Sequence, residues 1–419
     1  MTPQAYLRWF RPDRRLLTGS TFETTPLAIE QGDVVGVVVL GLGGPSEPDE
    51  AATFLYSRLM DPVEADLRVP RVLRHRVASV LARRWGQKLR KAFELIGGSS
   101  PLCRHAQEQA SALERRLNDR YGAATGARFR SYVAMRHGSP SMEEAQRRMA
   151  ADGVTKVVLL PLQPQYAAST TGSALSHWTA ALDGRQPWPT TLVAEYATHP
   201  KLVRAFSERV EEALQRFPRE ARSSVQILFT AHGTPRRHLT QYEDRYCCHV
   251  EATVQAVLAE RGESGRPVQI AYRRPFGGGQ PRGLSLADAL ADLSTDGSTA
   301  LLLVPVSYLS DRIETDFDLD VTARAEAAEA GVTAFEVSNG LNGHALLIEA
   351  LAETVASRLL PAAFQGDGFA SVEPPSLARP HTEAARVCSV CGRSTHTQTW
   401  PALPDPTVAE PTEPQRTAA

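Results

Sequence analysis

The first segment suited to chemistry is a histidine at the end of an apolar run. His232 closely follows residues 225–230 (VQILFT) and is itself followed by Gly233 and Pro235. A histidine at a strand end, beside glycine and proline, is placed on a rigid edge, where its imidazole accepts a proton near neutral pH or binds a borderline metal ion. The alternative is a loop histidine that only caps a turn, and this segment alone leaves both interpretations open.

A row of acidic residues follows a second apolar run, residues 300–306 (ALLLVPV). If the row is helical, Glu314 and Asp318 lie four residues apart on one face, with Asp311 and Asp316 as weaker members. Like charges at this spacing destabilise a helix slightly, so the row suits the passage of a divalent cation or a proton. The alternative is an ordinary first helical turn, in which the helix dipole favours acids.

Hydroxyl groups gather in a third segment, residues 163–173 (QPQYAASTTGS), which contains Tyr166, Ser169, Thr170 and Thr171. Hydroxyls and backbone N–H groups ahead of a helix cradle an anion or a carboxylate. The alternative is a well-capped turn.

These segments follow the strands of a predicted α/β fold. Apolar runs that are typical of buried parallel strands alternate with helical periodicity, at residues 34–42, 157–162, 225–230 and 300–306. Residues 157–166 resemble residues 301–310, which indicates two similar lobes, each a parallel sheet flanked by helices, with a cleft at the carboxyl ends of the strands. Pro45 and Ser46 occupy the middle of the first glycine-rich turn, so the dinucleotide-binding pattern is absent and a nicotinamide enzyme is disfavoured.

The domain organisation follows from the same patterns. We predict an irregular leader over residues 1–32, a first lobe over 33–175, a second lobe with the final helix over 176–364, and an irregular tail over 365–419. Eight prolines fall in the tail, which otherwise lacks apolar periodicity, and the pair Cys388 and Cys391 interrupts it.

Composition excludes several classes of protein. The 419 residues are 42% hydrophobic and 22% charged, as in an ordinary globular protein. The net charge of −1 offers no basic field for nucleic acid. No apolar stretch approaches the roughly 20 residues that span a bilayer, no secretory signal is recognisable, and five cysteines do not make a disulfide framework. We therefore expect a cytoplasmic protein.

Six segments, in this order along the chain, resemble the ferrochelatase family. They are LGLGGPSEPDEAATFL, FELIGGSSPL, VAMRHGSPSMEEA, LLPLQPQYAASTTGS, LFTAHGTP and VPVSYLSDRIETDFDLD, and the resemblance covers roughly residues 34–360. It implies two similar Rossmann-like lobes with a porphyrin cleft between them. It also implies the insertion of Fe²⁺ into a porphyrin, protoporphyrin IX or coproporphyrin III, which gives haem and releases two protons. It also implies that His232 and Glu314 form the inner pair that handles the metal and the protons.

Further roles come from the resemblance alone. Asp318 would lie on the metal or proton path, and five residues would contact the propionates or shape the rim of the pocket: Arg136, Tyr166, Ser169, Thr170 and Thr171. The implied partners are a porphyrin and ferrous iron. Peripheral membrane contact of the apolar cleft rim and the oligomeric state stay open.

The chain departs from the family pattern at several positions. Arg312 stands where His or Cys is common, Pro281 and Arg282 stand where a Trp-Leu pair is common, and Gly41 stands where Asn is common. Two alternatives therefore remain beside an active ferrochelatase. One is a catalytically impaired porphyrin- or haem-binding homologue, and the other is a chelatase for another divalent metal.

The tail cysteines suggest a second metal. Some ferrochelatases carry a [2Fe–2S] cluster on C-terminal cysteines, and Cys388, Cys391 and His396 have the spacing C-x₂-C-x₄-H. Because such a cluster usually needs four cysteines, His396 would have to replace one, or other cysteines would have to contribute: Cys103, Cys247 or Cys248. The adjacent Cys247 and Cys248 are by default simply part of a helix. The tail pair equally suits Zn²⁺ with two further ligands, or no metal at all.

Overall fold

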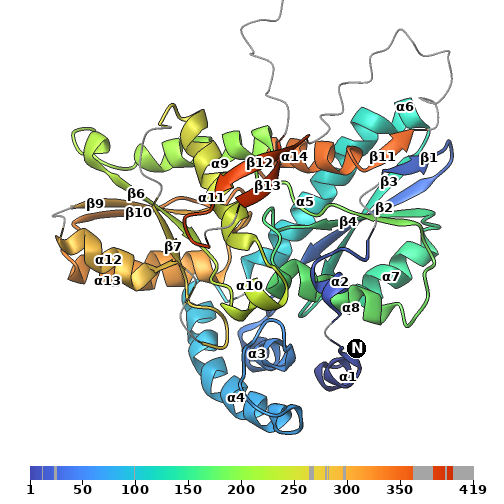
Figure 1. Cartoon of the computed structure of the whole chain (residues 1–419), viewed down its shortest axis with the longest axis horizontal. Coiled ribbons are helices and arrows are strands. Elements are labelled where there is room, and N and C mark those ends of the chain that lie inside the picture. The colour runs from blue at the N-terminus through green and yellow to red at the C-terminus, as the bar shows by residue number, and fades with distance from the viewer. Residues whose placement is uncertain are drawn as a thin grey trace, which may run out of the picture.

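The structure is a computed structural model of the whole chain. It describes residues 1–11, 13–22, 26–98, 100–263, 269–278, 281, 283–295, 299–361, 381–391 and 394–399. Two parallel sheets lie side by side and are flanked by helices (Figure 1). The predicted α/β architecture is therefore confirmed.

The first sheet has the strand order β3-β2-β4-β5, and all its pairs are parallel. Its strands are β2 (Val34–Gly41), β3 (Arg128–Met135), β4 (Lys156–Pro161) and β5 (Thr190–Leu192). The central strand β2 is buried over six successive residues, which explains its continuous run of apolar side chains. Because β5 pairs with β4, this sheet extends past residue 175, where the sequence placed the end of the first lobe.

The second sheet has the order β10-β9-β6-β7-β8 and is also parallel. Its strands are β6 (Gln226–Ala231), β7 (Ile270–Tyr272), β8 (Leu284–Ser285), β9 (Ala300–Pro305) and β10 (Ala334–Val337). The strands that precede the two candidate segments, β6 and β9, are direct neighbours, in the register Phe229 to Val304. Their carboxyl ends therefore meet at one edge.

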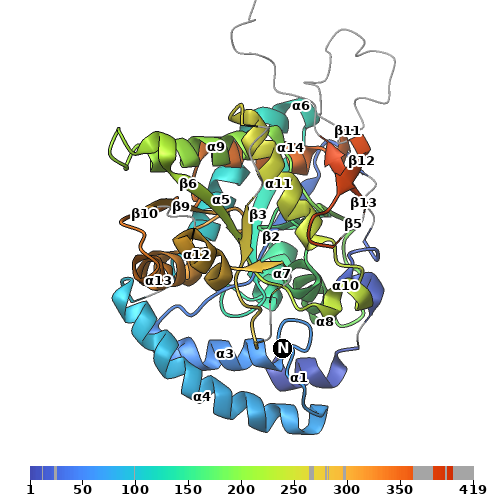
Figure 2. The same cartoon turned by 60° about the vertical axis from the view of Figure 1, so that its left-hand side comes forward.

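Helices cover both sheets. They are α3 (Ala51–Met60), α4 (Arg71–Leu95), α5 (Pro101–Leu117), α6 (Ala123–Thr125), α7 (Met142–Ala151), α8 (Ser173–Ala181), α9 (Pro200–Leu214), α10 (Arg237–Gln241), α11 (Tyr246–Glu260), α12 (Leu286–Thr295), α13 (Ala323–Glu329) and α14 (Ala345–Ala356). Wider π-type turns precede α8, at Ala168–Gly172, and α13, at Glu314–Thr322. The pair α3 and α4 projects beyond the sheets at one end of the molecule (Figure 2).

The leader is more regular than the sequence indicated. It contains α1 (Pro3–Trp9), α2 (Arg14–Leu17) and β1 (Leu27–Ile29). The prediction of an irregular segment was wrong, because apolar side chains at helical spacing are buried on the first lobe: Tyr6, Leu7, Phe10 and Leu17. Strand β1 pairs in parallel with β11 (Leu359–Pro361), so the segment after α14 returns to the start of the chain.

Part of the tail is also ordered. Residues His381–Val387 (β12) and Ser394–Thr399 (β13) form an antiparallel hairpin, and Cys388 and Cys391 lie between the two strands. This hairpin is more regular than the mostly extended or disordered tail that the sequence indicated, and its cysteine turn packs onto α11 through a buried cluster described below. Most of the other predicted tail residues lie outside the described residues.

Within the described part of the chain, no helix has both the length and the apolar character that a bilayer crossing requires.

Candidate functional site

The candidate residues lie where neighbouring strands of the second sheet end. His232 follows β6, Arg273 follows β7, and Glu314 begins the π-type turn after β9. Gly233 lets two of these loops approach, since a Cβ atom at this position would lie 1.8 Å from the carbonyl oxygen of Arg273. The strand order thus brings together side chains that are far apart in sequence.

A cavity of about 430 Å³ lies between this edge and the helices α3 and α4. His232, Glu314 and Asp318 all line this cavity, and their roles in catalysis and metal binding stay predictions. Aromatic and aliphatic side chains form much of the wall: Phe54, Leu55, Trp85, Leu89, Ala92, Phe276, Ile313 and Phe317. Four cations complete it: Arg58, Lys88, Arg273 and Arg274. The volume and lining match those of a small-molecule pocket.

His232 is held as a neutral imidazole. Burial, and next the positive charge of Arg58, lower the pKa of His232 to about 3. Its Nδ1 lies 3.3 Å from the hydroxyl of Tyr308, and its backbone N–H donates to Ser307 Oγ at 3.0 Å. When Nδ1 donates to Tyr308, the lone pair on Nε2 is left to accept a proton or bind a metal ion.

Glu314 is held as an anion. Burial alone would raise the pKa of Glu314, but Arg312, Arg273 and Arg58 outweigh it and hold that pKa well below its usual range. Both oxygens of Glu314 accept hydrogen bonds from Arg312, at 2.6 Å from Nε and 2.9 Å from Nη2. The cavity therefore combines a neutral base with a fixed negative charge.

The other acids of the row differ from Glu314. Burial raises the pKa of Asp318 despite an ion pair with Arg273, and burial raises the pKa of Asp316 to about 6. Asp311 has a structural role, because its two carboxylate oxygens accept hydrogen bonds from the Gly340 N–H at 2.7 Å and from Asn342 at 2.6 Å. Of this row, only Glu314 and Asp318 line the cavity.

The third segment lies partly at the site. Thr170 and Thr171 line a smaller cavity of about 70 Å³ on the other side of His232, and Ser169 is buried beside them. Tyr166 faces elsewhere, because its hydroxyl donates to the carbonyl of Leu17 at 3.0 Å.

Arg136 also lies away from the cavity that contains Glu314. Its Nη2 donates to Asp61 Oδ2 at 2.7 Å and its Nε donates to Ser173 at 2.9 Å, with both ion-pair partners almost completely buried. Arg136 lines a separate cavity near the N-terminus. The structure thus gives its guanidinium a carboxylate partner inside the protein, where the resemblance suggested a propionate.

Sequence reasoning missed three residues of the cavity region: Arg58, Arg273 and Tyr308. Tyr308 lies inside the segment VPVSYLSDRIET and contacts both His232 and Arg312. The Cζ atom of Arg312 lies 5.0 Å from the centroid of the Tyr308 ring. Its position four residues before Arg312, in a conspicuous segment, was the available signal. Arg58 and Arg273 carry no such signal, since arginines are frequent throughout the chain.

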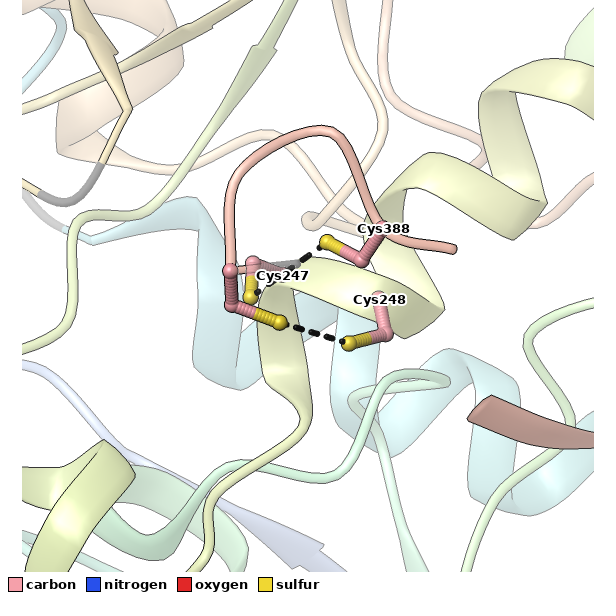
Figure 3. A group of neighbouring side chains, drawn as sticks. Cys247, Cys248 and Cys388 are labelled. Atoms are coloured by element: carbon pink, nitrogen blue, oxygen red, sulfur yellow. Dashed lines mark hydrogen bonds between the residues drawn. The ribbon is translucent and has the colours of Figure 1, made fainter. Parts of the chain in front are cut away.

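A second candidate site consists of four cysteines. Cys247 and Cys248 lie in the first turn of α11, and Cys388 lies in the turn of the hairpin (Figure 3). Cys391 lies in the same turn, between β12 and β13. Their four sulfur atoms all lie within 4.8 Å of one another, with 3.4 Å between Cys248 and Cys391 and 3.8 Å between Cys388 and Cys247. The N–H and hydroxyl of Ser389 both donate to Glu251 on α11, at 2.9 and 2.8 Å. These contacts make a buried thiol set that could hold a metal.

The four-cysteine group contains only some of the metal ligands that the sequence suggested. Cys247 and Cys248 join the tail pair, whereas Cys103 is no member of the four-cysteine group. His396 pairs with Ala384 in the hairpin backbone, and its side chain lies outside the described residues. Neighbouring thiols lower the pKa of Cys388 and raise the pKa of Cys248, so within this set a thiolate is favoured at Cys388 over Cys248.

Comparison with known proteins decides the family. The family model described as Ferrochelatase matches residues 34–359. The chain belongs to the ferrochelatase family. It is therefore a metal chelatase, a lyase of haem biosynthesis.

Relatives match over nearly their whole length. The ferrochelatase of Gloeobacter violaceus is 34% identical over 328 residues, covering 78% of this chain and 98% of that protein. The ferrochelatase of Geotalea daltonii is 31% identical over 322 residues, covering 77% of this chain and 97% of that protein. Among solved structures, SirB from Bacillus subtilis with Fe³⁺ has a TM-score of 0.45 at 13% identity, covering 80% of this chain and 98% of that one. That likeness is too distant to inform the site.

Two departures from the ferrochelatase pattern now have a structural description. A side chain on Gly41 would meet the sulfur of Met135 at 2.6 Å, so Met135 fills the space that a larger residue would need. Arg312 lies on Glu314, as described above. Pro281 is buried, and Arg282 lies outside the described residues.

Proposed function

We propose that this ferrochelatase-family protein inserts Fe²⁺ into a porphyrin, protoporphyrin IX or coproporphyrin III, within the cavity lined by His232 and Glu314. One observation carries the proposal: a neutral imidazole and an ionised carboxylate line one partly apolar cavity of about 430 Å³. Metal insertion requires that two pyrrole N–H protons leave while the divalent ion enters. The neutral His232 supplies a proton acceptor, and the anionic Glu314 offsets positive charge that develops near it.

The walls of the cavity suit the rest of the substrate. Aromatic side chains such as Trp85 and Phe276 offer flat apolar contact to a macrocycle. Lys88 and Arg274 are exposed at the cavity and form no ion pair among the described residues, so they suit the carboxylates of propionate side chains.

Anaerobic incubation with Fe²⁺ tests the proposal. The Soret band of protoporphyrin IX or coproporphyrin III should shift as metal enters, and His232→Ala and Glu314→Ala should each slow the reaction by at least about 100-fold. Tight porphyrin binding with no metal insertion by the unmodified protein would favour the impaired homologue. Insertion of Co²⁺ or Ni²⁺ in preference to Fe²⁺ would favour the other chelatase.

We also propose that Cys247, Cys248, Cys388 and Cys391 hold a metal. The donor set fits, because it is buried and all four sulfurs approach one another. Four sulfur ligands about 2.3 Å from one Zn²⁺ are about 3.8 Å apart in a tetrahedron, close to the distances of 3.4 Å between Cys248 and Cys391 and 3.8 Å between Cys388 and Cys247. A [2Fe–2S] cluster, the alternative, would place the two cysteine pairs on different irons and farther apart. In either form the metal would fasten the hairpin to α11.

We propose further that α4 makes peripheral contact with an anionic membrane. The helix carries eight arginines and lysines against one glutamate. Four apolar side chains of α4 are exposed: Val72, Leu73, Val80 and Leu95. A basic helix with exposed apolar residues is suited to a bilayer surface. Co-sedimentation with phosphatidylglycerol vesicles should weaken in the double variant Leu73→Ser/Val80→Ser. The control Leu284→Ser, which changes an exposed apolar residue of the second sheet, should bind like the unmodified protein. Equal binding of the unmodified protein and both variants would refute this contact.

A further inference from the structure

The salt bridge on Glu314 engages both oxygens of the carboxylate. The guanidinium of Arg312 contacts both oxygens, and the two side chains are only 14% and 10% exposed. A planar two-point contact of this kind is among the stronger charge-assisted hydrogen bonds.

The second acid of the cavity is engaged in the same way. Arg273 forms an ion pair with Asp318, and Arg58, which also lines the cavity, pairs with Glu64 behind it. Each carboxylate that faces the cavity therefore has its own guanidinium partner.

This arrangement opposes the binding of a divalent cation on the carboxylate side. A metal ion at Glu314 would have to displace Arg312 or share an oxygen with it, and in either case it would meet the positive charge of Arg312 at short range. The same cations lie near His232 and lower its pKa, but no described residue hydrogen-bonds to its Nε2, so a metal ion there would displace no guanidinium. The neutral imidazole is thus the accessible ligand.

We propose that Arg312 determines where the metal binds in this site: by holding both oxygens of Glu314, it keeps divalent ions off the carboxylate and leaves them to His232. Glu314 then acts as a fixed charge and not as a metal ligand. Arg312 is a positioning residue in this role, since it acts on the metal ion through Glu314. The inference rests on the proposed function, but it is tested by metal binding to the substrate-free protein.

Mn²⁺ binding, followed by electron paramagnetic resonance, provides the test with the full chain. Mn²⁺ prefers carboxylate and imidazole to thiolate, so the four-cysteine site contributes little to the signal. Arg312→Gln should bind Mn²⁺ at least about 10-fold more tightly than the unmodified protein, because a charge-assisted contact no longer competes. The double variant Arg312→Gln/Glu314→Gln should lose this gain. Arg312→Lys, which keeps the charge, should stay closer to the unmodified protein.

A matched control is Arg324→Gln, which removes an exposed arginine that pairs with Asp320 near the same turn and should leave Mn²⁺ binding unchanged. Folding of each variant is checked by circular dichroism. A folded Arg312→Gln variant without tighter binding, or a gain that survives in the double variant, would overturn the inference.

Kinetics give an independent readout. With Arg312 in place, Glu314→Gln should lower kcat for iron insertion while leaving the KM for Fe²⁺ unchanged, because Glu314 is not a ligand of the incoming ion. A rise in the KM for Fe²⁺ would overturn the inference even if insertion itself is confirmed. Failure of the unmodified protein to insert iron would instead overturn the proposed function and leave the Mn²⁺ result standing.

Discussion

The depressed pKa of His232 predicts a specific loss of stability in acid. The pKa of this group falls from an ordinary 6.5 to about 3, chiefly through burial. Between these values the unfolded chain binds a proton that the folded protein does not bind. Stability must therefore fall as the pH drops below 6.5, and the fall continues until the pH approaches 3.

The size of this effect follows from linkage. At about pH 5, an unfolded histidine of pKa 6.5 is almost fully charged while His232 is almost fully neutral, which corresponds to about 2 kcal/mol relative to about pH 7.5. This free-energy difference depends little on the pKa of His232 in the folded protein, because about pH 5 lies well above that pKa of about 3.

The perturbation is His232→Gln, which removes the titration but keeps a polar side chain. Urea unfolding is measured for both proteins at the two pH values. The unmodified protein should lose about 2 kcal/mol more than the variant on acidification, and the other histidines cancel in the comparison. The exposed His75→Gln serves as the control and should behave like the unmodified protein.

Equal losses in the unmodified protein and in His232→Gln, to within about 0.5 kcal/mol, would refute the reasoning. They would mean that His232 charges in the folded protein as it does in the unfolded chain. The imidazole would then not be held neutral for metal or proton binding below neutral pH.

Three further predictions concern other parts of the chain. Asp61→Asn should destabilise the protein by about 3–5 kcal/mol in urea unfolding, because it leaves the buried guanidinium of Arg136 without its ion-pair partner. Asp49→Asn, at the exposed ion pair with Arg90, should cost less than about 1 kcal/mol, and equal costs would contradict this reasoning. Gly233→Ala should abolish iron insertion in a folded protein, since its methyl group would lie 1.8 Å from a backbone oxygen, and an unchanged rate would show that the loop adapts. Elemental analysis should show that Cys388→Ser loses bound zinc or iron and that Cys103→Ser retains it. The visible spectrum distinguishes an iron–sulfur cluster from zinc, and an unmodified protein without either metal would contradict the assignment.

The sequence predicted those parts of the site that parallel strands position directly. The runs before His232 and Glu314 are continuous and apolar, so they mark buried neighbouring strands whose ends must meet. The spacing of Glu314 and Asp318 then placed both on one face, and both line the cavity. Local periodicity and strand order were sufficient here.

Side chains whose partners come from distant segments were not predictable in this way. Arg136 finds Asp61 at the end of α3, and Tyr166 finds Leu17 in the leader, which the sequence analysis treated as irregular. The position of Cys247 in a helix was clear, but its approach to Cys388 depends on how the hairpin packs. Long-range packing of this kind leaves no periodic signal in the chain.

The parallel pairing of β1 with β11 has a consequence for how a rigid ligand enters. It ties the last segment of the second lobe to the first, and Gln165 adds a tie of its own by donating to the Val306 carbonyl at 3.0 Å. A clamshell opening of the whole molecule would have to break both connections. The end of α3 is also held to the first lobe, by the buried pair of Asp61 with Arg136. A flat, bulky guest therefore has to enter through local movement of the side chains that α3 and α4 contribute to the cavity wall.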